Sequence, residues 1–172
     1  MAFVLAAVTG ELAYAQSVTA PGERPTNGPV AGASSGASNF APYCPELQRV
    51  IMLALAKERF AAIAGKPRHG DFQDTTLPLS GWKDCSLYGT RTYTCDFRDA
   101  GSAEEIAKNQ AAIVDEIKSC LEESWAEDAD RSSSTYVVLR SKRAPVSMTV
   151  SSGANGADGY VVRLTLFVRT GG

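Results

Sequence analysis

The sequence predicts an α+β fold, in which an antiparallel sheet of about five strands carries two helices on one face, in the order α-β-β-α-β-β-β. Two segments repeat apolar residues at the spacing of a helix, and five shorter segments have the composition or the alternation of strands. The strands come in runs between the helices, which favours an antiparallel sheet over a parallel one. The chain contains 4 cysteines, and we expect them to form disulfides that hold the fold together.

The length and charge of the chain narrow the classes of function. Its 172 residues suffice for one domain and an extension. Its net charge of −2 argues against a nucleic-acid partner, because binding to a phosphate backbone usually needs a strongly basic face. No apolar run approaches the roughly 20 residues of a membrane-spanning helix, so no transmembrane segment is expected.

Residues 1–15 resemble a signal peptide. Ala2 to Val8 form an apolar run, and Ala13-Tyr14-Ala15 is an A-x-A cleavage pattern. Two features do not fit, since no Lys or Arg precedes the apolar run and Glu11 lies close behind it. A start codon assigned too far downstream would explain the missing basic residues. The alternative is an ordinary apolar amino terminus. We expect export, which makes the protein periplasmic or secreted.

Residues 16–41 are rich in Pro, Gly, Ser and Ala and contain almost no bulky apolar side chain. Ordering such a segment costs more conformational entropy than its burial returns. We therefore predict a disordered linker over 16–41 and a single folded domain over 42–172.

The first helix is predicted over 45–64. Pro45 suits the first helical position, and Gly65 and Pro67 are signals for the end of a helix. The residues that repeat at helical spacing, and that we expect to be buried, are Leu47, Val50, Ile51, Ala54, Leu55 and Ile63.

The second helix is predicted over 102–125. Ser102 and Glu105 have the spacing of a capping box, in which the Ser hydroxyl accepts from the Glu105 N–H and the Glu carboxylate accepts from the backbone of the cap residue. The expected buried stripe contains Ile106, Ile113, Val114, Ile117 and Leu121.

Strands are predicted over 82–88, 92–97, 135–140, 146–150 and 160–169, and residues 66–80 are expected to be irregular with a short extended piece near 72–77. In the last strand, one face carries the apolar residues Val162, Leu164, Leu166 and Val168, and the other face carries Arg163, Thr165 and Arg169. Such alternation predicts a sheet with one buried face and one face in water. A helix followed by strands occurs twice, which indicates either a duplicated unit or chance.

Cys85 and Cys95 flank a predicted hairpin. With the three-residue loop 89–91, Leu87 lies opposite Tyr93 and Cys85 opposite Cys95, which permits a disulfide. A two-residue loop would place the two sulfurs on opposite faces. The three-residue loop also puts apolar side chains on one face, so we favour it.

Cys44 precedes the first helix and Cys120 lies near the end of the second. Two helices joined through a hairpin tend to be antiparallel, which brings the start of one beside the end of the other. We favour the pairs 44–120 and 85–95, and Cys44 with Cys85 or Cys95 is the main alternative, since four cysteines allow three pairings.

Other thiol chemistry lacks the required spacing. Zinc sites usually contain closely spaced cysteine pairs, and a redox C-x-x-C is missing from the sequence. No nucleotide-binding glycine pattern is present either. We therefore expect no cofactor.

Three groups of polar residues are candidates for chemistry or binding. His69 is the single histidine, but no G-x-S-x-G or H-E-x-x-H motif accompanies it, so we interpret it as a residue of a polar surface loop. An acidic run surrounds Trp125, and we interpret it as a solvated helix end that would suit a cationic partner. A possible binding face on the open side of the sheet contains Arg140, Arg163 and Arg169, with Lys142 and Arg143 nearby. The acidic run contains Glu122, Glu123, Glu127, Asp128 and Asp130.

These patterns favour an exported, non-enzymatic binding or accessory protein with an envelope protein as partner. The alternative is a small exported hydrolase whose residues come together from distant positions, with His69 and the acidic run as the first candidates. A cytosolic regulator with reduced thiols is a third hypothesis.

Overall fold

The computed structural model describes residues 41–156 and 159–169 of the chain. The predicted signal-like segment and all of the predicted linker except Ala41 lie outside these residues. The helices are α1 (Cys44–Leu55), η1 (Arg59–Ile63), α2 (Ala103–Cys120) and η2 (Ala129–Arg131). The strands are β1 (Ala64–Pro67), β2 (Phe72–Thr75), β3 (Lys83–Tyr88), β4 (Thr92–Ala100), β5 (Trp125–Glu127), β6 (Tyr136–Ser141), β7 (Val146–Ala154) and β8 (Tyr160–Val168).

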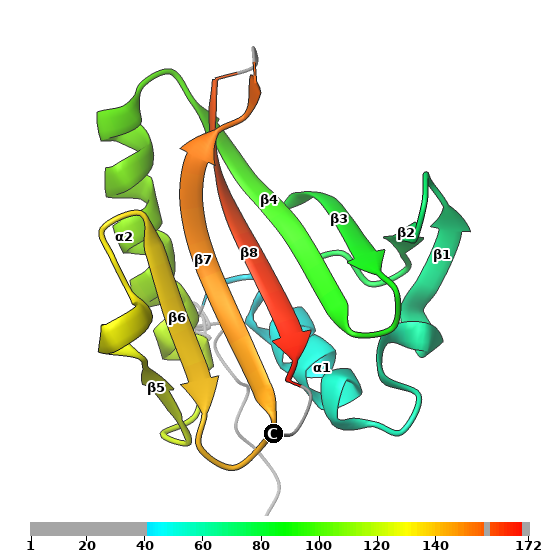
Figure 1. The fold of residues 1–172 in the computed structure, drawn as a ribbon. Helices are drawn as coiled ribbons and strands as arrows, with labels where there is room; N and C mark the ends of the chain where they lie inside the picture. The colour runs from blue at the N-terminus through cyan, green and yellow to red at the C-terminus, as the bar shows by residue number, and fades with distance from the viewer. Residues whose placement is uncertain (1–40, 157–158, 170–172) are drawn as a thin grey trace, which may run out of the picture. The chain divides into compact units, whose positions relative to one another are not determined.

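The described residues form one antiparallel sheet of 8 strands in the order β1-β2-β3-β4-β8-β7-β6-β5. The prediction of an α+β fold with an antiparallel sheet is confirmed, whereas the expected five strands and their order are wrong. The sheet consists of two four-strand meanders, each preceded by a helix, which join where β4 pairs with β8. Figure 1 shows both helices behind the sheet, so one face of the sheet is covered and the other is open.

The three strands that the sequence did not predict in full are short, and they lie at or next to an edge of the sheet. β1 and β2 have 4 residues each and β5 has 3, which is too short for a clear alternation of apolar and polar residues. Gly65 lies within β1 and does not end a helix. A Cβ atom at Gly65 would lie 3.0 Å from the backbone oxygen of Asp74, so the close approach of β2 favours glycine there.

The first helix is shorter than predicted, because α1 ends at Leu55 and a 3-10 turn follows. Continuing the buried stripe beyond Ala54 would bring Glu58 to the core face, since the stripe repeats every three to four residues. Phe60 and Ile63 are both buried, and the 3-10 turn brings them to the core out of phase with α1.

The second helix ends at Cys120, five residues earlier than predicted, because Leu121 is already extended. At its start, Ser102 Oγ accepts from the Glu105 N–H at 3.2 Å, as the capping box predicts. The Glu105 carboxylate accepts from Gly101 N–H, also at 3.2 Å, and not from the cap residue itself. The buried stripe of α2 also includes Gln110, which donates from Nε2 to the Val150 oxygen at 3.0 Å.

The structure contains the two disulfides that the favoured pairing predicts. In the β3–β4 hairpin, Leu87 lies opposite Tyr93 across a three-residue loop, and the Cα atoms of Cys85 and Cys95 are 4.0 Å apart. Cys44 is bonded to Cys120, so a disulfide joins the start of α1 to the end of α2.

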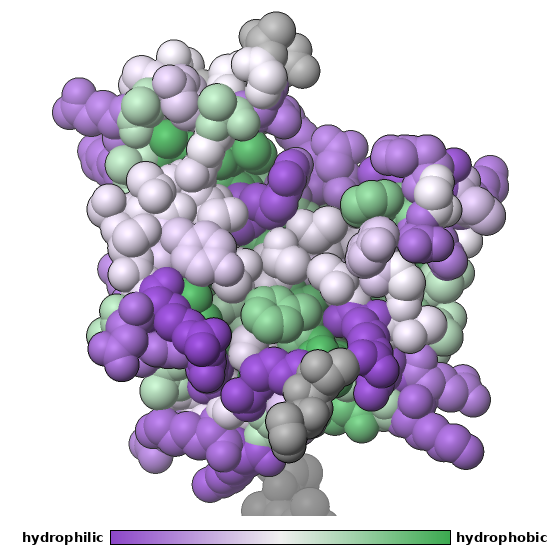
Figure 2. Space-filling view, viewed as in Figure 1, coloured by the Kyte–Doolittle hydropathy of each residue, from purple (hydrophilic) through white to green (hydrophobic). Residues whose placement is uncertain are grey.

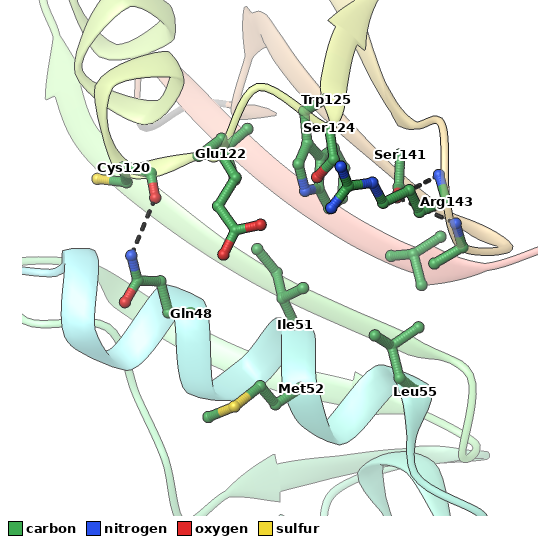
Figure 3. Close-up of a pocket in the computed structure, with 13 residues that line it drawn as sticks. Gln48, Ile51, Met52, Leu55, Cys120, Glu122, Ser124, Trp125, Ser141 and Arg143 are labelled. Carbon is green, nitrogen blue, oxygen red and sulfur yellow. Dashed lines mark hydrogen bonds between the residues drawn. The ribbon is translucent and has the colours of Figure 1, made fainter.

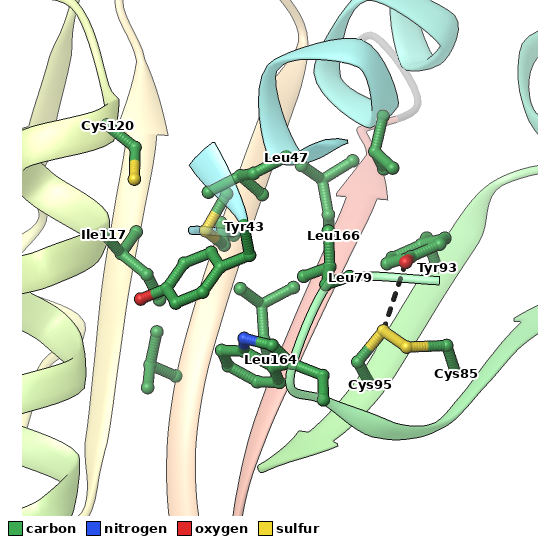
Figure 4. Close-up of a cluster of buried hydrophobic side chains, with 14 of the residues drawn as sticks. Tyr43, Leu47, Leu79, Cys85, Tyr93, Cys95, Ile117, Cys120, Leu164 and Leu166 are labelled. Atoms are coloured by element: carbon green, nitrogen blue, oxygen red, sulfur yellow. Dashed lines mark hydrogen bonds between the residues drawn. A yellow bond between two sulfur atoms is a disulfide. The ribbon is translucent and has the colours of Figure 1, made fainter. Parts of the chain in front are cut away.

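The core lies between the two helices and the covered face of the sheet. Figure 4 shows Leu47 of α1 and Ile117 of α2 approaching Leu164 and Leu166 of β8, and all four side chains are fully buried. Since β8 is a central strand, the helices pack over the middle of the sheet. One side of α1 and the carboxyl end of α2 border a groove.

Candidate functional site

A groove runs along the outer side of α1 in the described part of the chain. One wall is α1, the other is the segment after α2 together with β5, and the β6–β7 turn closes one end. Its volume is about 360 Å³. Figure 3 shows Ile51 and Leu55 of α1 pointing toward Trp125 on the opposite wall, while Met52 lies on the outer side of the helix at the rim.

The wall formed by α1 exposes large apolar side chains. Met52 is 65% exposed and Leu55 is 52% exposed, although both belong to a helix that packs on the core. The sequence predicted Leu55 to be buried, and that prediction is wrong. Residues 51–55 are apolar without interruption, so the buried stripe of α1 cannot accommodate all of them. This unbroken run was the signal for an exposed apolar surface, and the periodicity analysis missed it.

The opposite wall is held against α1 by a hydrogen bond and a turn. Gln48 Nε2 donates to the backbone oxygen of Cys120 at 3.2 Å, one turn of α1 after the disulfide. The Trp125 N–H donates to the Glu122 oxygen at 3.0 Å, and Trp125 pairs with Ser141 in the sheet. The half-buried indole of Trp125 is thereby fixed between α1 and the edge of the sheet. A second hollow of about 350 Å³ borders the same indole on the side of Lys118.

The β6–β7 turn at the end of the groove is built on Ser141. Its hydroxyl accepts from the N–H groups of Arg143 and Ala144, at 3.3 and 3.2 Å. Arg169 donates from Nη2 to the oxygens of Ser141 and Ala144, at 3.4 and 3.0 Å. Arg169, which we expected on a binding face, instead holds the turn that carries Arg143 into the groove.

The other two predicted arginines lie on the open face of the sheet, and each contacts a carboxylate. Arg163 donates two hydrogen bonds to Asp96, at 2.6 and 2.8 Å, and this contact raises the pKa of Arg163. Arg140 Nε lies 2.8 Å from Asp128 Oδ2. Both guanidinium groups therefore form ion pairs with carboxylates of the same chain. The structure does not bring the three arginines together as one site.

The open face between these ion pairs is lined by small hydroxyl side chains. Thr94 of β4 and Thr165 of β8 lie side by side, with their Oγ1 atoms 3.3 Å apart. Figure 2 views this face and shows pale, weakly polar residues over much of the sheet, with a hydrophobic aromatic ring near the centre and hydrophilic groups both there and around the rim.

His69 lies in the exposed turn between β1 and β2. Its ring contacts Phe72, with 5.3 Å between ring centroids, and its side chain forms no hydrogen bond with another described residue. A general base must lie within hydrogen-bond reach of the group that it deprotonates. No described residue provides His69 with such a neighbour, so the hydrolase hypothesis gains no geometric support from it.

The acidic run near Trp125 is divided among different partners. Lys118 lies 2.7 Å from Glu127, and Asp128 contacts Arg140. Glu122 and Glu123 are exposed and form no ion pair within residues 41–156 and 159–169. The described residues contain no group of three or more His, Cys, Asp or Glu placed to hold a metal ion. None of the described helices is both long and apolar enough to cross a membrane.

Comparison with known proteins gives no relative: the chain matches no family model, no curated protein and no solved structure. Function is therefore inferred from the geometry of the groove and from the disulfides.

Proposed function

We propose that the protein is an exported, non-enzymatic binding or accessory protein of the bacterial cell envelope, and that its groove takes up an apolar segment of an envelope protein. The observation that carries this proposal is the exposure of Met52 and Leu55, at 65% and 52%, in the lining of a groove that the indole of Trp125 also borders. Exposed apolar side chains gathered around a concave surface are typical of interaction sites.

The side chains of Met52 and Leu55 are not part of the buried stripe of α1, so we expect the protein to fold without them. A polar residue at either position of α1 would leave the core unchanged, because the buried stripe is formed by other residues. Binding to a partner would bury the two side chains and the indole together, and removal of apolar surface from water stabilises association.

The proposed location outside the cytoplasm is supported by the two disulfides. Structural disulfides in a small domain are typical of proteins that fold in an oxidising compartment. The signal-like pattern of residues 1–15 supports export, and the periplasm is the compartment that we propose.

Site-specific photo-crosslinking tests the binding function. A photoreactive residue placed at position 52 of the full chain, in cells that export it, is expected to give one prominent protein adduct. The same residue at Lys108, an exposed position on α2 outside the groove, serves as the control. An L55D substitution added to the position-52 probe should remove the adduct. The proposal would be contradicted by the same adducts at both positions, or by none at position 52.

A further inference from the structure

The helix α1 carries a second stripe beside the one that faces the core, and its member Ile51 is partly buried against the core. Its members occur at the spacing i, i+3, i+4 and i+7, and three of the four are apolar. A row of side chains at this spacing is what one helix presents to another in helix–helix packing. The residues of this outer stripe are Gln48, Ile51, Met52 and Leu55. The groove is therefore shaped on one wall for a helical occupant.

Two opposite charges follow one another along the groove. Glu122 belongs to the segment that the Gln48–Cys120 hydrogen bond holds over the start of the outer stripe. Arg143 comes from the turn at the other end, and Figure 3 shows it nearer Leu55, with its side chain extending toward Trp125. Neither side chain forms an ion pair with a described residue, so both charges are available to an occupant.

The environment of Glu122 strengthens the negative end. Glu123 is also exposed and unpaired among the described residues, and α2 ends at Cys120. The carboxyl end of a helix carries a partial negative charge. At the other end, Lys142 is exposed beside Arg143. The groove thus has an acidic end near Gln48 and a basic end near Leu55, joined by an apolar middle.

Building on the proposed function, we propose that the occupant is an amphipathic helical segment of a partner protein. Its apolar stripe packs against Met52, Leu55 and Trp125. It carries Lys or Arg at the end that lies near Glu122 and Asp or Glu at the end near Arg143. A fatty acid or an anionic lipid would match the basic end alone and would leave the acidic end facing hydrocarbon, which is costly for a carboxylate.

Selection from a displayed library of random peptides tests this assignment without knowledge of the natural partner. The bait is the oxidised full chain, and the matched control bait is M52D/L55D, which keeps the buried stripe but removes the apolar surface. Enriched sequences that bind the wild-type bait and fail on the control are expected to have apolar residues at helical spacing. They should have basic residues toward one end and acidic residues toward the other.

A charge-reversed bait, E122K/R143E, tests the polarity. It should bind peptides selected on the wild-type bait about tenfold more weakly, because two attractive contacts become repulsive. Its own selection should return the opposite order of charges. A spin label at either end of a selected peptide broadens the NMR signals of nearby residues, so it would show whether that end lies near Glu122 or near Arg143.

The outcomes separate the two proposals. Groove-dependent peptides without helical spacing or charge order would overturn the helical assignment and leave the binding function intact. Peptides that bind M52D/L55D as well as they bind the wild type, or no enrichment at all, would count against the groove as a protein-binding site. Palmitate binding that requires Met52, together with a failed selection, would replace the peptide by a lipid and so overturn the assignment.

Discussion

Cys44, the first residue of α1, is bonded to Cys120, the last residue of α2, with 5.2 Å between their Cα atoms. This disulfide sets the distance between the two walls of the groove, because α1 forms one wall and the segment after Cys120 forms the other. The fold and the candidate site therefore depend on the same covalent link.

Removing this disulfide should cost more stability than removing the other one. The two bridges close loops of 76 and 10 residues. The chain-entropy model gives about 4.5 kcal/mol for the long loop and about 2.7 kcal/mol for the short one. We expect C44A/C120A to unfold at lower urea concentration than C85A/C95A. Equal losses, or a larger loss in the hairpin variant, would show that loop length does not determine the stabilisation here.

The two stripes of α1 should respond differently to truncation. Leu47 is fully buried, so L47A should lower the free energy of unfolding by about 3 kcal/mol. Met52 is 65% exposed, so M52A should change it by less than about 0.5 kcal/mol while weakening peptide binding. Urea unfolding measures the first quantity and titration with a selected peptide the second. A large loss of stability in M52A would mean that the outer stripe supports the fold.

The cap of α2 offers a test with a control in the same helix. S102A removes the hydrogen bond to the Glu105 N–H and should cost about 1 kcal/mol. S119A removes an exposed serine whose hydroxyl donates to the Glu116 oxygen within the helix, and it should be neutral or slightly stabilising. Thermal unfolding of both variants makes the comparison. Similar losses from the two substitutions would argue against a capping role for Ser102.

The protein should lose stability in alkaline solution. Burial raises the pKa of Tyr93 well above the ordinary tyrosine value, and burial together with Glu116 raises the pKa of Tyr43. The unfolded chain releases these protons above about pH 10, whereas the folded protein retains them. The stabilisation is therefore present below that pH and is lost as the pH rises further.

Urea unfolding between about pH 8 and about pH 11 measures this loss, with Y93F as the control variant. The substitution removes the 2.8 Å hydrogen bond from Tyr93 to the Leu77 oxygen, which should cost about 1 kcal/mol at neutral pH. It should also make the alkaline decline shallower. A difference between wild type and Y93F that stays constant with pH would exclude Tyr93 as a source of the decline.

The sequence predicted the parts of the fold that have a clear local signal. Ser102 indicated the start of α2, and the placement of Leu87 and Tyr93 on one apolar face indicated the register of the hairpin. The pairing of β4 with β8 had no such signal, because it joins segments about 70 residues apart and depends on the whole sheet. Short strands such as β5 form only because β6 offers them an edge.

The candidate site was less predictable than the fold. Periodicity assigned Leu55 to the buried stripe of α1, although the core leaves Leu55 exposed together with Met52, for which the pattern made no prediction. Gln110 shows the opposite error, since a polar residue occupies the buried stripe of α2 and bonds to Val150 and Ser152. Arg169 was expected at a binding face from its place in a strand pattern, but its partners lie in a distant turn.

The last strand of the chain, β8, lies between β4 and β7. Until residues 160–168 are synthesised and inserted, β4 and β7 each have an unpaired hydrogen-bonding edge, and the two meanders have no contact through the sheet. A nascent chain, which emerges with its amino end first, therefore cannot complete this sheet before residue 168 has been synthesised. The insertion of β8 is the step that joins the two meanders into one sheet.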